Sequence, residues 1–247
     1  MNKRLLAIAA PLAPALLALL AACGSETSTP PPGQEAATGG DAPTASGPVL
    51  AGPPVHVLAL GDSLFAGYNL GEGESYPAML EEALRSRGIN AAVSNAGVSG
   101  DTTQAGLQRL DFVLENESET PALAIVELGG NDLLRGLPPE QTRRNLDEIL
   151  SKLDERGIPV LLMGMRAPPN LGADFVSAFD AIYPALAERH GAELVPFFLE
   201  SVYDQPELIQ PDRVHPTADG IEAIVAATLD EVVAALPEDA RDQAQTE

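Results

Sequence analysis

The chain has 247 residues, enough for one medium domain or two small ones. Hydrophobic residues make up 45% and mean hydropathy is +0.03, which excludes both a disordered polyampholyte and a protein with many membrane spans. The 36 acidic and 14 basic residues give a formal charge of −22, so neither nucleic acid nor an anionic membrane surface is an expected electrostatic partner. A single cysteine excludes an intramolecular disulfide and a Cys-rich metal site.

The N-terminus has the pattern of an export signal. A basic start is followed by an apolar stretch, Leu5–Ala22, and small residues precede Cys23. Pro11 and Pro14 interrupt the stretch, which makes a permanent membrane anchor the weaker alternative. Residues 20–23, Leu-Ala-Ala-Cys, resemble a bacterial lipobox.

That resemblance implies a signal peptide over residues 1–22 and a diacylglycerol on Cys23. The expected location is then the cell envelope, in the periplasm or at the outer membrane, with the lipid anchor as the contact to the membrane. The alternative is a secreted protein in which the thiol is incidental. Residues 23–54, which carry no aromatic side chain and are rich in Gly and Pro, are predicted to be a flexible linker.

From residue 55 onward, short apolar runs alternate with segments of helical periodicity. The predicted strands are Val55–Leu60, Ala91–Ser94, Ala122–Leu128, Pro159–Met163 and Glu193–Val195. The predicted helices are Tyr76–Arg87, Thr102–Leu114, Pro139–Arg156, Asp174–His190 and Ala218–Leu236. Nearly continuous apolar strands separated by helices predict a parallel sheet covered on both faces. One α/β domain is expected over residues 55–236, with a polar tail over 237–247 that frays.

Ligands of such sheets meet the loops at the carboxyl ends of the strands. One of these loops carries Ser63, and a serine hydroxyl needs a base that a third group orients. Among the three histidines, His190 precedes a glycine at a helix end and is interpreted as a solvated capping residue, while His56 lies within the first strand. His215 remains as the candidate base.

Asp212 lies three residues before His215, a spacing that puts both side chains on one side of a tight turn. Its carboxylate can hold one imidazole nitrogen while the other takes the proton of Ser63. The alternatives are a charge pair at a helix entry for Asp212 and His215, and an N-cap role for Ser63. The backbone N–H groups of Ser63 and Gly97 and the side-chain amide of Asn131 are the candidate oxyanion donors.

Four separated blocks carry a resemblance to the SGNH, or GDSL, hydrolases. They read Ala-Leu-Gly-Asp-Ser-Leu-Phe-Ala-Gly-Tyr (59–68), Asn-Ala-Gly-Val-Ser-Gly-Asp-Thr-Thr (95–103), Val-Glu-Leu-Gly-Gly-Asn-Asp (126–132) and Asp-Arg-Val-His-Pro (212–216). Their detail is similar to the bacterial arylesterase, thioesterase I and lysophospholipase subgroup. One position departs from the family, because Arg213 stands where a glycine is common.

The resemblance implies a three-layer α/β/α fold of the flavodoxin-like type with a five-stranded parallel sheet. It implies Ser63 as nucleophile, His215 as base, Asp212 as its orienting group, and an oxyanion hole from Ser63, Gly97 and Asn131. No metal or other cofactor is expected, and a monomer is expected. Aryl, short acyl and lysophospholipid esters, and thioesters as well, are the implied substrates.

Two other classes of function stay open at this point. The first is a hydrolase-like binding module without catalysis, and the second is a metal-dependent phosphoesterase, suggested by the Gly-Asp and Gly-Asn-Asp sequences and a late histidine. Three scattered histidines fit a two-metal site poorly. Within the esterase interpretation, the segments Met165–Gly172 and Ser99–Leu107 are expected to wall the acyl pocket.

Overall fold

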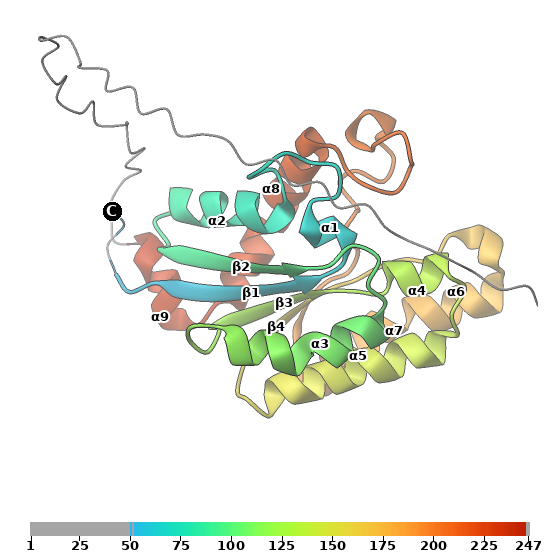
Figure 1. Cartoon of the computed structure of the whole chain (residues 1–247), viewed down its shortest axis with the longest axis horizontal. Coiled ribbons are helices and arrows are strands. Elements are labelled where there is room, and N and C mark those ends of the chain that lie inside the picture. The colour runs from blue at the N-terminus through green and yellow to red at the C-terminus, as the bar shows by residue number, and fades with distance from the viewer. Residues whose placement is uncertain (1–49, 51, 246–247) are drawn as a thin grey trace, which may run out of the picture. The chain divides into compact units, whose positions relative to one another are not determined.

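Five parallel strands form the centre of the protein, in the order β2-β1-β3-β4-β5 (Figure 1). The structure, a computed structural model, describes residue 50 and residues 52–245. The predicted signal peptide, Cys23 and nearly all of the predicted linker lie outside these residues. The strands are β1 (Val55–Gly61), β2 (Ala91–Gly97), β3 (Leu123–Glu127), β4 (Val160–Met163) and β5 (Glu193–Val195).

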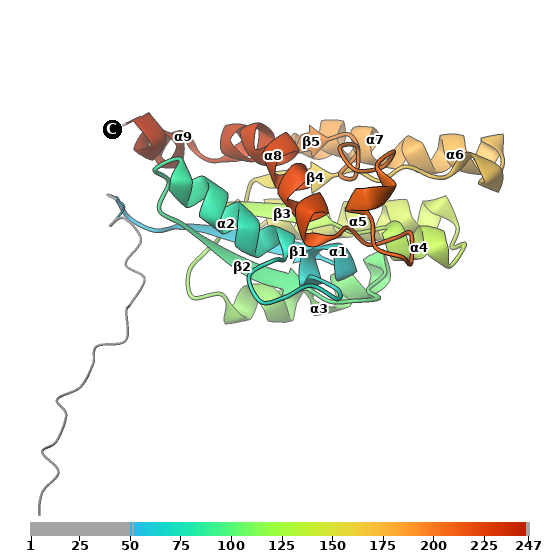
Figure 2. The same ribbon diagram turned by 90° about the horizontal axis from the view of Figure 1, so that it is seen from above.

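Helices cover both faces of the sheet, as a three-layer α/β/α fold requires. The longer ones are α2 (Tyr76–Ser86), α3 (Thr103–Asn116), α5 (Pro139–Asp154), α6 (Ala173–Asp180), α7 (Ile182–His190) and α8 (Ala218–Ala235). Short α1 (Ser63–Ala66), α4 (Gly130–Leu134) and α9 (Glu238–Arg241), with 3-10 turns η1 (Pro169–Leu171), η2 (Pro206–Leu208) and η3 (Asp242–Gln245), complete the described part. Helices α2 and α8 pack together on one face, and α3, α5 and α7 pack on the other (Figures 1 and 2).

The core lies in the sheet and against it. All five residues of β3 are buried, and so are all four of β4, because helices cover both of their faces. Tyr76 and Phe65 stack with their ring centroids 5.1 Å apart, and the Tyr76 hydroxyl shares a hydrogen bond of 2.8 Å with Thr228 on α8. This aromatic contact fixes α1, which follows β1, against the first long helix.

The predicted elements agree with the structure in kind and differ at some ends. Strand β2 runs three residues further than expected, to Gly97, in register with Gly61 of β1. The predicted helix over 174–190 is two helices, because Pro184 has no N–H to donate to the carbonyl four residues earlier. Gly157 and Gly191 follow their helices with φ of +67° and +61°, the left-handed terminators that the sequence predicts.

As far as the structure describes it, to residue 245, the C-terminal segment does not fray as predicted. Residues 238–241 form α9, and Ala240 is only 5% exposed. The Gln243 side chain accepts a hydrogen bond from Asn90 N–H and donates one to the carbonyl of Pro53, which ties the segment to the amino-terminal edge of the sheet. Within the described residues, no helix is both long enough and apolar enough to cross a membrane.

Candidate active site

Strand β1 ends in a tight turn that presents Ser63. A Cβ on Gly61 would lie 2.6 Å from the Phe65 ring, so the turn has no room for a side chain there. Asp62 then caps α1 by accepting the Leu64 N–H at 3.0 Å. The N-cap is therefore Asp62, and Ser63 is the first helical residue, which leaves its hydroxyl for other contacts.

The second half of the site is an irregular loop before α8. The Asp212 carboxylate accepts hydrogen bonds from the backbone N–H groups of Val214 at 2.9 Å and His215 at 3.0 Å through Oδ1. Its Oδ2 lies 2.7 Å from His215 Nδ1. Burial opposes ionisation of this carboxyl, but the hydrogen bonds from His215 and Val214 outweigh it and lower the pKa of Asp212 to about 2.

The fold brings the two halves into contact. His215 Nε2 lies 2.8 Å from Ser63 Oγ, although the two residues are 152 positions apart in the sequence. The Tyr68 ring, just beyond α1, packs on the His215 imidazole with centroids 4.4 Å apart. The arrangement holds a hydroxyl, an imidazole and an ionised carboxylate in one line, which is the geometry that activates a serine for nucleophilic attack.

Gln210 joins the histidine loop to the serine side. Its side-chain amide donates to the carbonyl of Tyr68 at 2.9 Å and to that of Pro216 at 2.8 Å, while its backbone N–H donates to the His215 carbonyl at 2.7 Å. Gln210 therefore fixes the distance between the segment that follows Ser63 and the segment that carries His215. No catalytic chemistry requires a glutamine there, so the sequence pattern gave no signal for it.

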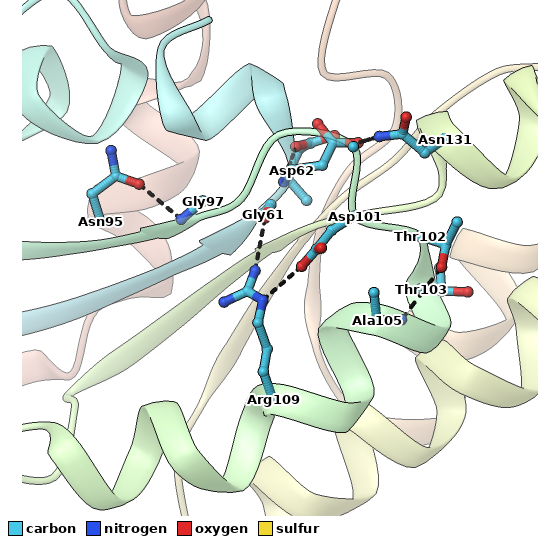
Figure 3. A network of polar contacts seen from close by, with 12 residues as sticks. Gly61, Asp62, Asn95, Gly97, Asp101, Thr102, Thr103, Ala105, Arg109 and Asn131 are labelled. Atoms are coloured by element: carbon cyan, nitrogen blue, oxygen red, sulfur yellow. Dashed lines mark hydrogen bonds and ion pairs between the residues drawn. The ribbon is translucent and has the colours of Figure 1, made fainter. Parts of the chain in front are cut away.

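Asn131 lies at the start of α4, directly after β3. Its Nδ2 donates to Asp62 Oδ2 at 2.8 Å, beside Ser63 (Figure 3). The amide nitrogen has a second hydrogen that this contact does not use. Asp132, the next residue, is buried and anchors α4, because its carboxylate accepts hydrogen bonds from Thr103 N, Thr103 Oγ1 and Thr142 Oγ1.

Gly97 does not meet the expectation of a free oxyanion donor. Its N–H donates to Asn95 Oδ1 at 2.9 Å (Figure 3). A Cβ at this position would lie 2.4 Å from the backbone nitrogen of Ala66 in α1. The close approach that requires a glycine here is that of α1 to β2, so packing of the protein itself explains Gly97.

Arg109 contacts both the end of β1 and the loop that follows β2. Arg109 of α3 reaches up to the loop that follows β2, where its Nε lies 2.6 Å from Asp101 Oδ2 (Figure 3). Its Nη2 donates to the Gly61 carbonyl at 2.9 Å, and Val98 N–H donates to the same oxygen at 3.1 Å. Within the segment 99–107, which we expected to wall the acyl pocket, Asp101 pairs with the arginine that holds the turn before Asp62.

The other two histidines lie away from this site. His56 faces Glu119 at 3.4 Å, and His190 lies 2.7 Å from Asp147 Oδ1 of α5. The His190 side chain is only 11% exposed, so it joins α7 to α5 and is not the solvated cap that the sequence suggested. Among the residues that the structure describes, no group of three or more His, Cys, Asp or Glu side chains is arranged to hold a metal ion.

Comparison with known proteins agrees with this geometry. The profile of the GDSL-like Lipase/Acylhydrolase family matches residues 59–223. An arylesterase of Vibrio mimicus is 44% identical over 160 residues, which cover 65% of this chain and 79% of the relative. Thioesterase 1/protease 1/lysophospholipase L1 of Escherichia coli K12 is 44% identical over 163 residues, 66% of this chain and 76% of that protein.

Solved structures give the same result for the fold. The crystal structure of AlinE4, an SGNH-hydrolase family esterase, is 65% identical and aligns with a TM-score of 0.65 over 76% of this chain and 99% of that one. The structure of TesA is 37% identical, with a TM-score of 0.69 over 73% and 99% of the two chains. The similarity thus extends over the strands and loops that carry the four sequence blocks.

Proposed function

The chain belongs to the GDSL-like lipase/acylhydrolase family and is an SGNH-type esterase, and we propose that it cleaves its ester through an acyl-enzyme on Ser63. The observation that carries the proposal is the pair of hydrogen bonds from Ser63 Oγ to His215 Nε2 at 2.8 Å and from His215 Nδ1 to Asp212 Oδ2 at 2.7 Å. Together the two contacts orient His215 so that its Nε2 can take the proton of the Ser63 hydroxyl.

In the proposed reaction, Ser63 Oγ attacks the ester carbonyl while His215 Nε2 takes the hydroxyl proton. The tetrahedral intermediate collapses, the C–O bond to the alcohol breaks, and His215 returns the proton to the leaving oxygen. A water molecule, deprotonated by the same imidazole, then releases the acid. Asp212 is ionised above pH 4, since its pKa is about 2, so it stabilises the imidazolium in both halves.

The developing oxyanion requires hydrogen-bond donors that are not already engaged. The Ser63 N–H opens α1 and has no partner among the described residues, and Asn131 Nδ2 retains one free hydrogen. We propose Gly100 as the third donor in place of Gly97. Its N–H has no partner within the described part of the chain, and Arg135 at the end of α4 holds its carbonyl at 2.7 Å.

Apolar side chains at the same edge of the sheet support an apolar acyl or aryl group as substrate. Tyr68, Val98, Leu134 and Leu171 are each at least 40% exposed, and they follow the carboxyl ends of β1, β2, β3 and β4 in turn. Carboxyl ends of parallel strands meet at one edge, so the loops that carry these side chains lie at the same edge of the sheet as Ser63. Aryl, short acyl and lysophospholipid esters fit such a rim, and the thioesters of the named relatives are a second class to assay.

We further propose that the enzyme is exported and held to the cell envelope by a lipid on Cys23. The support is the order of a basic start, an apolar stretch and small residues before the lone cysteine. Metabolic labelling with a fatty-acid analogue tests it: the wild-type chain takes up the label, and Cys23→Ser does not. Equal labelling of both chains would contradict the proposal.

The test of the catalytic proposal is labelling with a fluorophosphonate, followed by peptide mapping. We expect a single adduct on Ser63, loss of ester turnover with the labelling, and neither labelling nor turnover in Ser63→Ala. Labelling of another residue would overturn the assignment. Hydrolysis that resists the reagent and is abolished by EDTA would favour a metal-dependent phosphoesterase, and absence of turnover in the labelled and unlabelled protein would favour a binding module.

A further inference from the structure

Glu127 is a buried carboxyl group that the proposed mechanism does not use. It is the last residue of β3, it is 0% exposed, and the four residues before it are apolar. Its Oε2 accepts only the Asp62 N–H, at 3.4 Å, and its Oε1 has no hydrogen-bond partner within the described residues. A buried anion with so few donors would be costly, so the position favours a neutral acid.

The surroundings of Glu127 determine where its proton lies. Burial, and then the charge of Asp62, raise the pKa of Glu127 well above its ordinary value. The Asp62 N–H donates to Glu127 Oε2 at 3.4 Å, so the two residues lie side by side, and a proton on this pair of carboxyl groups belongs on the one with fewer donors. Asp62 already accepts from Leu64 N and Asn131 Nδ2, so Asp62 is the anion and Glu127 the donor.

Asp132 shows how the same protein treats a buried carboxylate that needs donors. It lies in α4, the short helix that follows Glu127, and is equally buried. Its two oxygens accept three hydrogen bonds, from Thr103 N at 2.8 Å, Thr103 Oγ1 at 2.5 Å and Thr142 Oγ1 at 3.2 Å. Asp132 accepts hydrogen bonds from three donors, whereas Glu127 faces a single N–H at 3.4 Å. This difference indicates that Asp132 acts as an acceptor and Glu127 as a donor.

We propose that Glu127 is a positioning residue whose protonated carboxyl donates to Asp62 and thereby holds the Asn131 amide toward the oxygen of the bound ester. The chain of contacts is short: Asp62 N–H donates to Glu127 Oε2 at 3.4 Å, and Asn131 Nδ2 donates to Asp62 Oδ2 at 2.8 Å. Asn131 cannot rotate away without losing that bond. The inference rests on the proposed serine-esterase function.

Two substitutions test whether Glu127 acts as a hydrogen-bond donor or only fills space. Glu127→Gln keeps the shape, offers an N–H to Asp62 and an oxygen to the Asp62 N–H, and is expected to retain kcat within about twofold. Glu127→Leu keeps much of the volume but cannot donate, and kcat is expected to fall about tenfold with KM nearly unchanged, because an oxyanion donor acts in the transition state.

Asn131→Ala provides the coupling measurement. If Glu127 acts through Asn131, adding Glu127→Leu to Asn131→Ala lowers kcat by less than about twofold, whereas independent effects would multiply. Thr228→Val is the matched control, since it removes a buried hydrogen bond to Tyr76 on α8 and leaves the strand ends untouched. It is expected to lower the denaturation midpoint and leave kcat unchanged.

Three results would overturn the inference: a Gln variant as impaired as the Leu variant, a Leu variant with full kcat, or independent effects in the double variant. If Glu127→Leu does not fold, the Gln variant decides alone, with retained kcat in support and a tenfold loss against. Continued turnover by Ser63→Ala would instead overturn the proposed function itself, whatever the Glu127 variants do.

Discussion

The two halves of the active site are built in different ways. Asp62 and Ser63 are 2% and 9% exposed and directly follow strand β1, which lies between β2 and β3 in the sheet. Asp212 and His215 lie on an irregular loop, and the Asp212 side chain is 37% exposed. Sheet register fixes the serine half, whereas a few side-chain hydrogen bonds fix the histidine half. The histidine half should therefore be the more sensitive to single substitutions outside the catalytic groups.

The largest expected effect comes from removing the base. His215→Ala leaves Ser63 without a proton acceptor, and we expect kcat to fall by about 10⁶-fold with the fold retained. Steady-state kinetics with an aryl ester, together with circular dichroism, measure this. A loss of less than about a hundredfold would mean that the serine half works without the histidine half.

Asn131→Ala tests the serine half. It removes one oxyanion donor and should lower kcat by roughly 10²–10³-fold, with a smaller effect on KM. Asn116→Ala is a suitable control, because Asn116 makes a local hydrogen bond at the far end of α3. An unchanged kcat in Asn131→Ala would remove this residue from the oxyanion hole.

Gln210→Ala tests how the histidine half is held. The variant loses three side-chain hydrogen bonds, two donated to Tyr68 O and Pro216 O and one accepted from Asn69 Nδ2, each worth about 0.5–1.5 kcal/mol, and we expect kcat to fall about tenfold. Gln205→Ala removes a glutamine hydrogen bond to Ser201 in a neighbouring turn without touching the serine half, and it should keep full activity. Equal activities of the two variants would contradict the bridging role of Gln210.

The contributions of Asp212 and Glu127 to the stability of the fold should change with pH in opposite directions. The pKa of Asp212 is lowered to about 2, so its ionised form stabilises the fold above pH 4, and that stability is lost between pH 4 and pH 2. The pKa of Glu127 is raised by burial, so its neutral form stabilises the fold at acid pH, and that contribution declines as pH rises.

Chemical denaturation over a pH range tests this contrast. Asp212→Asn should be less stable than the wild type at pH 7 and approach it near pH 2. Glu127→Gln should gain on the wild type as pH rises, because its amide does not ionise. Parallel stability curves for both variants would show that neither carboxyl has the assigned charge.

The smallest expected effect concerns Arg213. Its φ of +62° lies in the left-handed region, which explains why a glycine is common at this position in the family. Arg213→Gly should relieve strain and raise the free energy of unfolding by no more than about 1 kcal/mol. Asn69→Gly is the matched control at φ +58°, and since Asn tolerates this region, a gain there as large as at Arg213 would contradict the explanation.

Sequence periodicity predicted the parallel sheet and the long helices, because covered strands are continuously apolar and helices repeat every three to four residues. It missed α1, α4 and α9, which have only four or five residues and therefore show no period. Pro184 was a visible signal for the break between α6 and α7. The error at the C-terminus arose because Ala240 and Gln243 acquire partners only in the folded chain.

The candidate catalytic groups were predictable because only three histidines had to be sorted. The oxyanion donors were less so, since the backbone N–H groups of Gly97 and Gly100 differ only in the partner that folding gives them. Glu127 did leave a signal, as one carboxyl in an apolar strand. Gln210 left none, because its contacts join segments that are far apart in the sequence.

The most direct test of the central claim is to trap the covalent intermediate. An acid-quenched reaction with an aryl ester, examined by intact mass and peptide mapping, should show one acyl group on Ser63 in the wild type and none in Ser63→Ala. An acyl group on any other residue, or turnover by Ser63→Ala at the wild-type rate, would contradict the account.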